Sequence, residues 1–510
     1  MADSGSGPQR PLALRSPQGR WLMAVTVLGS GMAFLDGTIV NVALPTIGRE
    51  LHASTGSLQW VLSGYLLTLA SLILLGGSLG DRFGRRRVFV LGAGLFAAAS
   101  LLCAIAPSIG LLIGARLLQG CGGALLTPGS LAMIEASFRR EDRAPAIGAW
   151  SGLTGVATAV GPLLGGYLIG AVSWRAAFFI NLPIGAFVML AARRVPESRD
   201  EQLNGQLDGA GAVLAFLALA SSTYALIEAP AGGSAVVVAF AGVVAALALG
   251  AFVVRERRSA APMLPLDIFS AQFSAANLVT FVVYASLGGV FFLLVAFLQV
   301  SLGYSPVAAG AASLPVTLLM LALSARSGAL AQRIGPRLPL AVGPVIVAAG
   351  MLLMAQIGRG ASYTGSVLPA VLVFGLGLTL VVSPVTATAL ASAGERHSGI
   401  ASGVNNAVAR LAGLLAVVLL PVIAGLSGRR FFDAGDMTRG FHVAMLVCAG
   451  LATAGGVLAW LTIDNGALAP AQDTGGAPLP APAPAFSCAV AGAPPAYPAE
   501  HPRARPPADG

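Results

Sequence analysis

The sequence predicts an all-α protein that crosses a membrane many times, and two observations carry this prediction. First, 56% of the 510 residues are hydrophobic and only 10% are charged, whereas soluble domains carry about 25% charged residues. Second, the apolar residues gather into runs of roughly 20 residues, the length that crosses about 30 Å of hydrocarbon. A soluble fold has no interior large enough for this much apolar surface. We therefore expect a polytopic membrane protein.

Applying that length along the chain gives fourteen expected transmembrane helices. They cover residues 21–47, 57–80, 88–106, 109–134, 144–170, 174–192, 209–229, 234–254, 275–300, 306–325, 338–357, 364–392, 399–426 and 441–463. The runs before residue 209 are sharper than those at 209–254, where small residues weaken the contrast. Residues 464–510 are rich in Pro, Ala and Gly, and we expect this tail to be disordered.

Arginine clusters follow the second, fourth, sixth and eighth expected helices. Their members are Arg82, Arg85, Arg86, Arg87, Arg139, Arg140, Arg143, Arg193, Arg194, Arg199, Arg255, Arg257 and Arg258. Loops rich in Arg face the cytoplasm, so both termini are expected inside the cell and the protein in the cell membrane. The loop with Arg429, Arg430 and Arg439 opposes this orientation, but the early loops usually dominate.

Composition also excludes several classes of function. The net charge is +9, but the arginines lie scattered between apolar runs, so we expect no nucleic-acid partner. All 30 basic residues are Arg, which excludes the Lys of an ATP-binding P-loop or of a Schiff base. The four Cys and four His residues are isolated and predict neither a disulfide framework nor a metal site. We expect a monomer without a cofactor, driven by an ion gradient.

An internal repeat organises the chain. The segment Gly77–Arg87 lies between the second and third expected helices, and a weaker copy begins at position 328, a shift of 251 residues. Helices 1–6 therefore match helices 9–14, with helices 7 and 8 as an inserted pair. The expected segments are an N-terminal stretch (1–20), a first half (21–200), the inserted pair (201–260), a second half (261–463) and the tail (464–510). Transporters built from two such halves hold substrate near the membrane midplane between them.

Several motifs fall at matching places in this pattern. They are LDGTIVNVALP at 35–45, GSLGDRFGRRR at 77–87, RLLQG at 116–120, GPLLGG at 161–166, Gln299 with GYSP at 303–306, Gly310 and Pro315, and ASGVNN at 401–406 followed by Arg410. Together they resemble the major facilitator superfamily, in its fourteen-span drug:proton antiporter branch. The resemblance implies a proton-coupled exporter of small lipophilic compounds, such as drugs, antibiotics or secreted metabolites, that works by alternating access and performs no enzymatic reaction.

The resemblance also implies two gating elements. One is the arginine segment, with Gly77, Asp81, Arg82, Gly84, Arg85 and Arg86, where Asp81 would contact the start of helix 13 near residues 398–403. The copy carries Gln332 in place of the acid, so this latch should be asymmetric. The other is a seal on the extracellular side at Gly161, Pro162 and Gly165. A solvated loop charge and a plain small-residue packing face are the alternatives.

Asp36 is the main candidate for proton coupling, because an acid inside a transmembrane helix is costly and usually functional. Helix geometry places Asp36 and Arg116 at similar depth in the membrane. Burial raises the pKa of an acid and a nearby cation lowers it, so this pair could exchange protons near neutral pH. A fixed structural ion pair is the alternative.

The candidate substrate-binding residues are polar side chains within the expected helices. They are Asn41, Gln119, Gln299, Asn405, Asn406 and Arg410, with the aromatic residues Phe34, Tyr65, Phe281, Tyr284, Phe291, Phe292 and Phe297 as possible lining. Arg410 either contacts substrate, balances a transient negative charge or makes structural hydrogen bonds. The tenth expected helix contains no acid. This favours neutral or anionic lipophilic substrates, and aromatic cations are the alternative.

Three other readings stay open at this point. An importer or symporter could use the same fold, although the Gly161–Pro162 pair and the fourteen helices favour export. A membrane-embedded transferase would need clustered acids or a nucleophile beside a His, and the sequence has neither. A sensor that binds its ligand without moving it is the third alternative.

Overall fold

The structure, a computed structural model, describes residues 11–198, 208–230, 233–259, 268–393, 398–426 and 428–468. Within these residues fourteen helical segments are long and apolar enough to cross a membrane, which confirms the predicted number. The tail beyond residue 468, including Cys488, lies outside the described residues.

The helices follow the predicted order. Their bounds are α1 Pro17–Glu50, α2 Thr55–Phe83, α3 Arg85–Ala104, α4 Ile109–Ser137, α5 Arg140–Ala171, α6 Ala176–Phe179, α7 Asn181–Ala191, α8 Gly209–Glu228, α9 Ala235–Arg258, α10 Ala271–Val300, α11 Pro306–Ala312, α12 Leu314–Ile334, α13 Arg337–Met354, α14 Leu368–Ser392, α15 Ser398–Ile423 and α16 Ala434–Thr462. One π-helical turn, Tyr363–Val367, leads into α14, and short 3-10 turns follow α7, α15 and α16. The last of these, Asn465–Leu468, is ordered although it falls in the expected tail.

Two expected single helices are each broken in two. The sixth divides into α6 and α7 at Ile180, and the tenth divides into α11 and α12 at Ser313. Pro183 and Pro315 lie just after these breaks. A proline has no backbone N–H to give to the preceding turn, so the helical hydrogen bonding is interrupted at both points.

The arginine segment is more helical than the sequence suggested. We expected a loop at 77–87, but α2 continues through Phe83 and α3 begins at Arg85, which leaves Gly84 alone between them. Gly84 has φ +105°, a value that a residue with a side chain rarely adopts. In the copy, Gly335 ends α12 with φ +86°. The charged ends of these helices therefore extend as helix past the apolar stretch.

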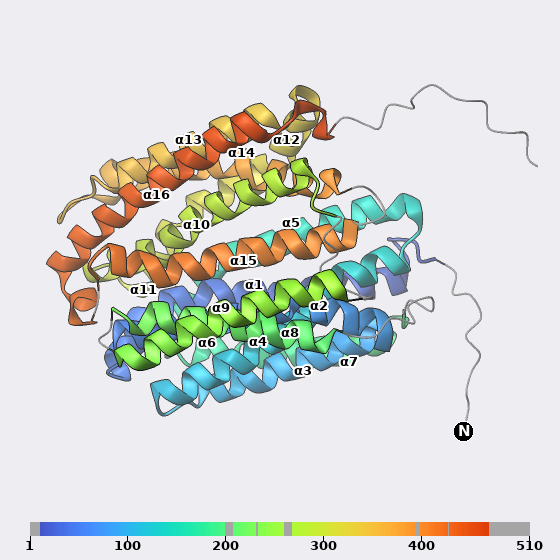
Figure 1. Cartoon of the computed structure of the whole chain (residues 1–510), viewed down its shortest axis with the longest axis horizontal. Helices are drawn as coiled ribbons and strands as arrows, with labels where there is room; N and C mark the ends of the chain where they lie inside the picture. Colours follow the sequence, from blue (N-terminus) through green and yellow to red (C-terminus); the bar gives the residue numbers. More distant parts are fainter. Residues whose placement is uncertain are drawn as a thin grey trace, which may run out of the picture. The chain divides into compact units, whose positions relative to one another are not determined.

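Helices from the same part of the chain pack together. Figure 1 shows the blue and cyan α1–α4 along one side and the yellow to red α12, α13, α14 and α16 along the other. We call α1–α7 the first half and α10–α16 the second half. α5 packs on α1 and on α11, and α15 packs on α10 and on α2, so these two helices join the halves. The inserted α8 and α9 pack on each other, and α8 also contacts α2.

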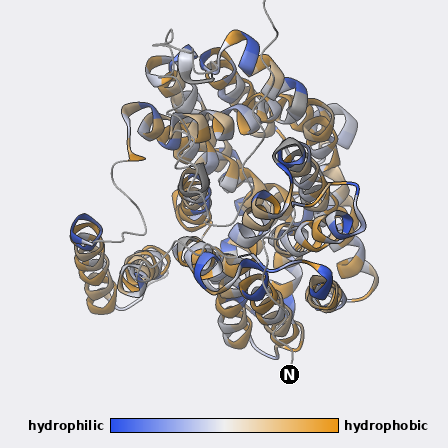
Figure 2. Ribbon diagram, turned by 90° about the vertical axis from the view of Figure 1, so that its right-hand side faces the viewer, coloured by the Kyte–Doolittle hydropathy of each residue, from blue (hydrophilic) through white to orange (hydrophobic). Residues whose placement is uncertain are grey.

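The outer surface is apolar along the helices. Viewed along the bundle, the helix flanks are mostly hydrophobic and hydrophilic colour gathers at their ends and connections (Figure 2). α9 shows this most clearly, since Val236 is 78% exposed and Phe240 and Leu247 are each 68% exposed. Such exposure would be costly in water and is ordinary in lipid. The molecule is therefore a multi-pass membrane protein.

Candidate functional site

A buried acid and a buried base meet inside the first half. Asp36 on α1 is 1% exposed and Arg116 on α4 is 0% exposed. Nη1 of Arg116 donates hydrogen bonds to Oδ2 of Asp36 and, at 2.6 Å, to Oε1 of Gln119. The sequence placed the two charges at similar depth, and the structure brings them into direct contact.

Amide and hydroxyl side chains complete this arrangement. Nε2 of Gln119 donates to Oδ1 of Asp36 and to Oγ of Ser100, both at 2.8 Å. Nδ2 of Asn181 donates to the same two atoms at 3.1 and 3.2 Å. We call Asp36, Ser100, Arg116, Gln119 and Asn181 the Asp36 cluster. Arg116, Gln119 and Asn181 each direct a donor at the carboxylate, an arrangement that suits an acceptor-only, ionised Asp36.

Two further contacts surround the guanidinium of Arg116. Its Nε donates to the carbonyl oxygen of Val61 at 2.9 Å, and its Cζ lies 4.4 Å from the ring centroid of Tyr65. A buried ion pair is tolerated only when further hydrogen bonds offset the lost hydration. Removing either charge would leave the other buried without compensation.

Small residues on α4 explain how α2 and α3 approach α4 closely beside the cluster. A Cβ at Gly120 would collide with Thr68 and the Tyr65 carbonyl of α2, and a Cβ at Gly122 would collide with the backbone of Phe96 on α3. Helix backbones approach closely where side chains are absent. The motif at 116–120 therefore supplies both the charge and the small residue that draws α2 inward.

The opposite face of α1 looks toward the second half. Phe34 lies two positions before Asp36, which turns it about 200° around the helix, and it is half-buried. Cζ of Arg410 on α15 lies 5.4 Å from the Phe34 ring centroid. A Cβ at Gly37 would meet nothing within 4 Å, so open space adjoins this face of α1.

The GPLLGG motif packs two neighbouring helices onto α5. Cβ atoms at Gly161 and Gly165 would collide with Thr38 and Ile39 of α1. On the other face, Gly166 abuts the Pro306 carbonyl of α11. These glycines are therefore a packing device between α1, α5 and α11.

Hydrogen bonds between the halves occur at one end of the bundle, where α1, α5, α10 and α15 end. We call it the Glu50 end. Nε2 of Gln299 donates to the Val42 carbonyl at 3.0 Å, and Oγ1 of Thr55 donates to the Gly428 carbonyl at 2.8 Å. Nε2 of Gln59 donates to the carbonyls of Val417 and Val418, each at 3.1 Å. Together with the α5–α11 contact, these bonds hold the halves together at the Glu50 end.

The opposite end, which we call the Gly84 end, carries the arginine segment. Asp81 forms an ion pair with Arg85 at 2.8 Å, and Arg85 also donates to the Ala132 carbonyl at 3.2 Å. The backbone N–H of Arg86 donates to Oε1 of Glu197 at 3.0 Å. Arg82 stacks on Phe83, with its Cζ 5.5 Å from the ring centroid. Gly77 packs near Pro128 of α4.

The expected latch between Asp81 and residues 398–403 stays a prediction. Residues 394–397 and the side chains of residues 398–400 and 402 lie outside the described part of the chain. In the structure Asp81 bonds to its own segment instead, through Arg85.

Four of the polar residues predicted to contact substrate form hydrogen bonds within the protein. Gln119 belongs to the Asp36 cluster, and Gln299 joins the halves. Asn41 donates to the Gly37 carbonyl of its own helix at 3.1 Å. Asn405 is buried and donates to Asn277 and Thr280 of α10. Asn406 is exposed and Arg410 is half-buried, one turn apart on α15.

Three residues of these sites, Ser100, Asn181 and Glu197, were not predicted from the sequence. Asn181 interrupts an apolar run, and an amide within a transmembrane helix is a usable signal. Ser100 lies among alanines and gives no such signal. Glu197 acts on a helix start more than a hundred residues away, a pairing that spacing along the chain does not reveal.

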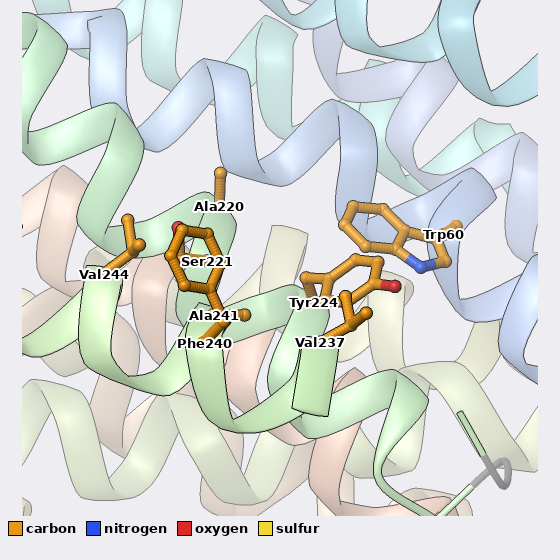
Figure 3. Close-up of a pocket in the computed structure, with 8 residues that line it drawn as sticks. All are labelled: Trp60, Ala220, Ser221, Tyr224, Val237, Phe240, Ala241 and Val244. Atoms are coloured by element: carbon orange, nitrogen blue, oxygen red, sulfur yellow. The ribbon is translucent and has the colours of Figure 1, made fainter. Parts of the chain in front are cut away.

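A surface pocket lies away from these residues. It has a volume of about 340 Å³ and lies between α2, α8 and α9, with Trp60, Ala220, Ser221, Tyr224, Val237, Phe240, Ala241 and Val244 around it (Figure 3). Its lining carries no charge, and we assign it no chemistry. Within the described residues no three His, Cys, Asp or Glu side chains come together as metal ligands.

Comparison with known proteins agrees with this architecture. The family model described as Major Facilitator Superfamily matches residues 26–417. The tetracenomycin C resistance and export protein of Streptomyces glaucescens is 36% identical over 419 residues, which cover 79% of this chain and 75% of the relative. The puromycin resistance protein of Streptomyces alboniger is 34% identical over 494 residues, 93% of this chain and 97% of the relative. The multidrug resistance protein Stp of Mycobacterium tuberculosis is 36% identical over 389 residues, 76% of this chain and 72% of the relative.

Solved structures share the fold at low identity. A crystal structure of the peptide transporter POT in complex with sulfate has a TM-score of 0.65 at 16% identity, covering 88% of this chain and 96% of that chain. A bacterial homologue of the human lysosomal transporter Spinster, in an inward-facing and occupied conformation, has a TM-score of 0.62 at 14% identity, with 88% and 97% covered.

Proposed function

The chain belongs to the Major Facilitator Superfamily, and on this premise we propose that it is a proton-coupled exporter of small lipophilic compounds. Relatives named for resistance to tetracenomycin C and puromycin support export as the direction of transport. Drugs, antibiotics and secreted metabolites are the substrate classes that follow from this proposal. The protein works as a monomer in the cell membrane with both termini in the cytoplasm.

The single observation that carries proton coupling is the Asp36 cluster. The carboxylate of Asp36 accepts three hydrogen bonds, one each from Arg116, Gln119 and Asn181. A protonated Asp36 would lose the charge attraction to Arg116, and its new O–H would need an acceptor where donors now point. Proton uptake at Asp36 therefore changes how α1 packs on α4 and α7.

This local change couples to alternating access through α1. The helix carries Asp36 on one face, and its residues Thr38 and Ile39 pack against Gly161 and Gly165 of α5. α5 in turn contacts α11 of the second half at the Glu50 end. The proposed orientation places the Glu50 end outside, so the structure corresponds to a state closed to the exterior. A proton can reach Asp36 from outside only when these contacts open. When they close again, Asp36 becomes accessible from the cytoplasm.

Transport in everted membrane vesicles tests the proposal. We expect an imposed proton gradient to drive accumulation of a dye or antibiotic, and the Asp36→Asn variant to lose this accumulation while keeping gradient-independent exchange of the same compound. Asp36→Glu, which keeps the titratable group, should retain part of the gradient-driven transport. Accumulation only in right-side-out vesicles, or gradient-driven export by Asp36→Asn equal to wild type, would contradict the proposal.

A further inference from the structure

We propose that the face between α1 and α15 binds an anionic aromatic molecule, with its acidic group on Arg410 and its ring beside Phe34. This inference rests on the proposed export function and names the substrate class of that transporter. It goes beyond general lipophilicity, because it assigns the charge of the cargo and the residue that reads it.

Within the part of the chain that the structure describes, Arg410 has no carboxylate beside it. Among the described residues, no carboxylate oxygen lies within 4.0 Å of Arg410, and its contact is the face of the Phe34 ring. Arg116 has Asp36, so that pair is neutral as a whole. In the described part of the second half, the acids are Asp433, Asp436 and Asp464. All three lie at helix ends, far along the chain from the middle of α15.

Arg410 lies at a depth where an unpaired charge is expensive. It is the thirteenth residue of α15, which has 26 residues, and charges at the centre of a membrane-spanning helix are rare unless they serve a function. Side chains usually offset such a cost by pairing. Here the partner is absent from the described residues, so a carboxylate, sulfonate or phenolate of the cargo can supply it.

The surroundings of Arg410 are aromatic and partly open. Phe34 is half-buried, and Tyr284 on α10 and Tyr65 on α2 lie within electrostatic range of Arg410. Cβ atoms added at Gly37 on α1 or at Gly413 on α15 would meet nothing within 4 Å. Open space therefore adjoins α1 and α15 about one turn beyond Phe34 and Arg410.

The same features disfavour a cationic cargo. A cation would meet the positive charge of Arg410 and a carboxylate at Asp36 already engaged by Arg116. A neutral cargo would remove water from Arg410 without replacing its hydrogen bonds. An anion gains charge-assisted hydrogen bonds from the planar guanidinium, which matches a carboxylate in two-point geometry.

Binding and export of a matched pair of naphthoquinones test the inference. Lawsone is an anion at neutral pH, and lawsone methyl ether has the same ring without the charge. We would measure the affinity of both by equilibrium dialysis against the purified full chain, and their gradient-driven export from vesicles. The variants are Arg410→Gln and Arg410→Lys. The control is Arg439→Gln, which removes an arginine whose side chain is 80% exposed and paired with Asp436 at the Glu50 end.

We expect wild type to bind lawsone at least about tenfold more tightly than its methyl ether, the scale of one charge-assisted hydrogen bond. Arg410→Gln should abolish this preference, while the ether should bind at least as tightly as it does to wild type, which also shows that the variant is folded. Arg410→Lys should keep part of the preference, and Arg439→Gln all of it.

Equal affinity for both compounds in wild type, or an unchanged preference in Arg410→Gln, would overturn the inference. If wild type exports the ether but not lawsone, export stands and the anionic cargo is wrong. If the gradient drives export of neither compound nor of any compound in a screen of antibiotics and dyes, the proposed function itself fails.

Discussion

The two halves of the molecule bury charge in opposite ways. The first half encloses an acid with its base, and every member of the Asp36 cluster is at most 1% exposed. The second half carries Arg410 with an aromatic ring as its contact and open space nearby. A paired charge can respond to a proton without attracting a ligand, whereas an unpaired charge attracts a ligand of opposite sign. We infer that the first half manages the proton and that Arg410 of the second half recognises the charge of the cargo.

The turn at the Gly84 end repeats in both halves with a different side chain. In the first half, Glu197 follows α7 and its 3-10 turn and accepts the N–H of Arg86 at 3.0 Å. In the second half, Asn465 just after α16 accepts the N–H of Arg337 at 3.3 Å. Neither α3 nor α13 has a cap from its own preceding residue. The geometry of the cap is therefore shared by the halves, but its charge is not.

The largest expected effect comes from separating the charges of the Asp36 cluster. Arg116→Gln or Asp36→Asn alone leaves one buried charge without its partner, which typically costs about 3–5 kcal/mol of stability. The double variant removes both charges, so we expect it to melt closer to wild type than either single variant. Thermal unfolding of the three purified variants measures this.

Transport by the double variant then separates stability from coupling. A folded double variant should show no gradient-driven export. If it exports like wild type, the first half does not manage the proton and the comparison between the halves fails.

The next largest effect should come from the contact between α5 and α11. A Cβ in Gly310→Ala would collide with the Pro162 carbonyl, so the helices must separate at the Glu50 end. We expect a several-fold loss of transport and a leak of protons through the membrane. Gly155→Ala on the same α5 is the matched control, since a Cβ there meets nothing within 4 Å.

Proton leak is measured by the decay of a pH gradient across proteoliposomes. Equal decay for Gly310→Ala and Gly155→Ala would show that this contact does not seal the Glu50 end.

A smaller effect is expected from the two caps at the Gly84 end. Removing a helix cap costs about 0.5–2 kcal/mol, and Glu197 also forms ion pairs with Arg86 at 3.5 Å and Arg87 at 3.7 Å. Glu197→Ala should therefore lower the melting temperature more than Asn465→Ala. High salt should reduce the difference in melting temperature, because the additional ion pairs of Glu197 are partly exposed to solvent and are screened by salt. If Asn465→Ala lowered the melting temperature more than Glu197→Ala, the two caps would rank in the opposite order.

The smallest effect concerns the N-termini of α6 in the first half and of α16, its counterpart in the second half. In the second half, Asp433 caps α16 by accepting the N–H groups of Gly435 and Asp436 at 2.8 Å, whereas α6 has no side-chain cap. The hydrogen bond from Asp436 is the main reason that the pKa of Asp433 lies below its ordinary value.

A lowered pKa in the folded state means that the stabilisation is present above the pKa of the unfolded chain and is lost as pH falls through the folded value. Asp433→Ala should therefore melt slightly below wild type at pH 7, and the gap should close in acid. A gap that persists after Asp433 is protonated would show that charge at this cap contributes nothing.

Much of the fold followed from the sequence because the bilayer leaves few choices. Backbone groups in hydrocarbon must bond within their own helix, so fourteen apolar runs of the right length could only become fourteen helices. The breaks at Ile180 and Ser313 were visible as prolines, but the runs stayed apolar across them and were read as continuous. The loop expected at 77–87 was wrong because hydropathy marks where the apolar stretch ends, not where helical hydrogen bonding ends.

The site could be predicted only in part. Asp36 and Arg116 were found because buried charges are costly and therefore conspicuous in an apolar sequence. Asn41, Gln119, Gln299 and Asn405 looked equally available to a substrate, since the sequence does not say which way a polar side chain points. The structure turns each of them toward a carbonyl, hydroxyl, amide or carboxylate partner within the protein.

The sequence by itself determined the membrane class, the number of helices, the repeat and the two charges of the first half. Each of these depends on the cost of placing a given residue in hydrocarbon, which is a property of the residue and its neighbours in the chain. The tertiary structure alone decided that Ser100 and Asn181 complete the Asp36 cluster, that Glu197 caps α3, and that Arg410 lies over the ring of Phe34. These contacts join residues far apart in the chain, and only the packing of the helices brings their side chains within bonding distance.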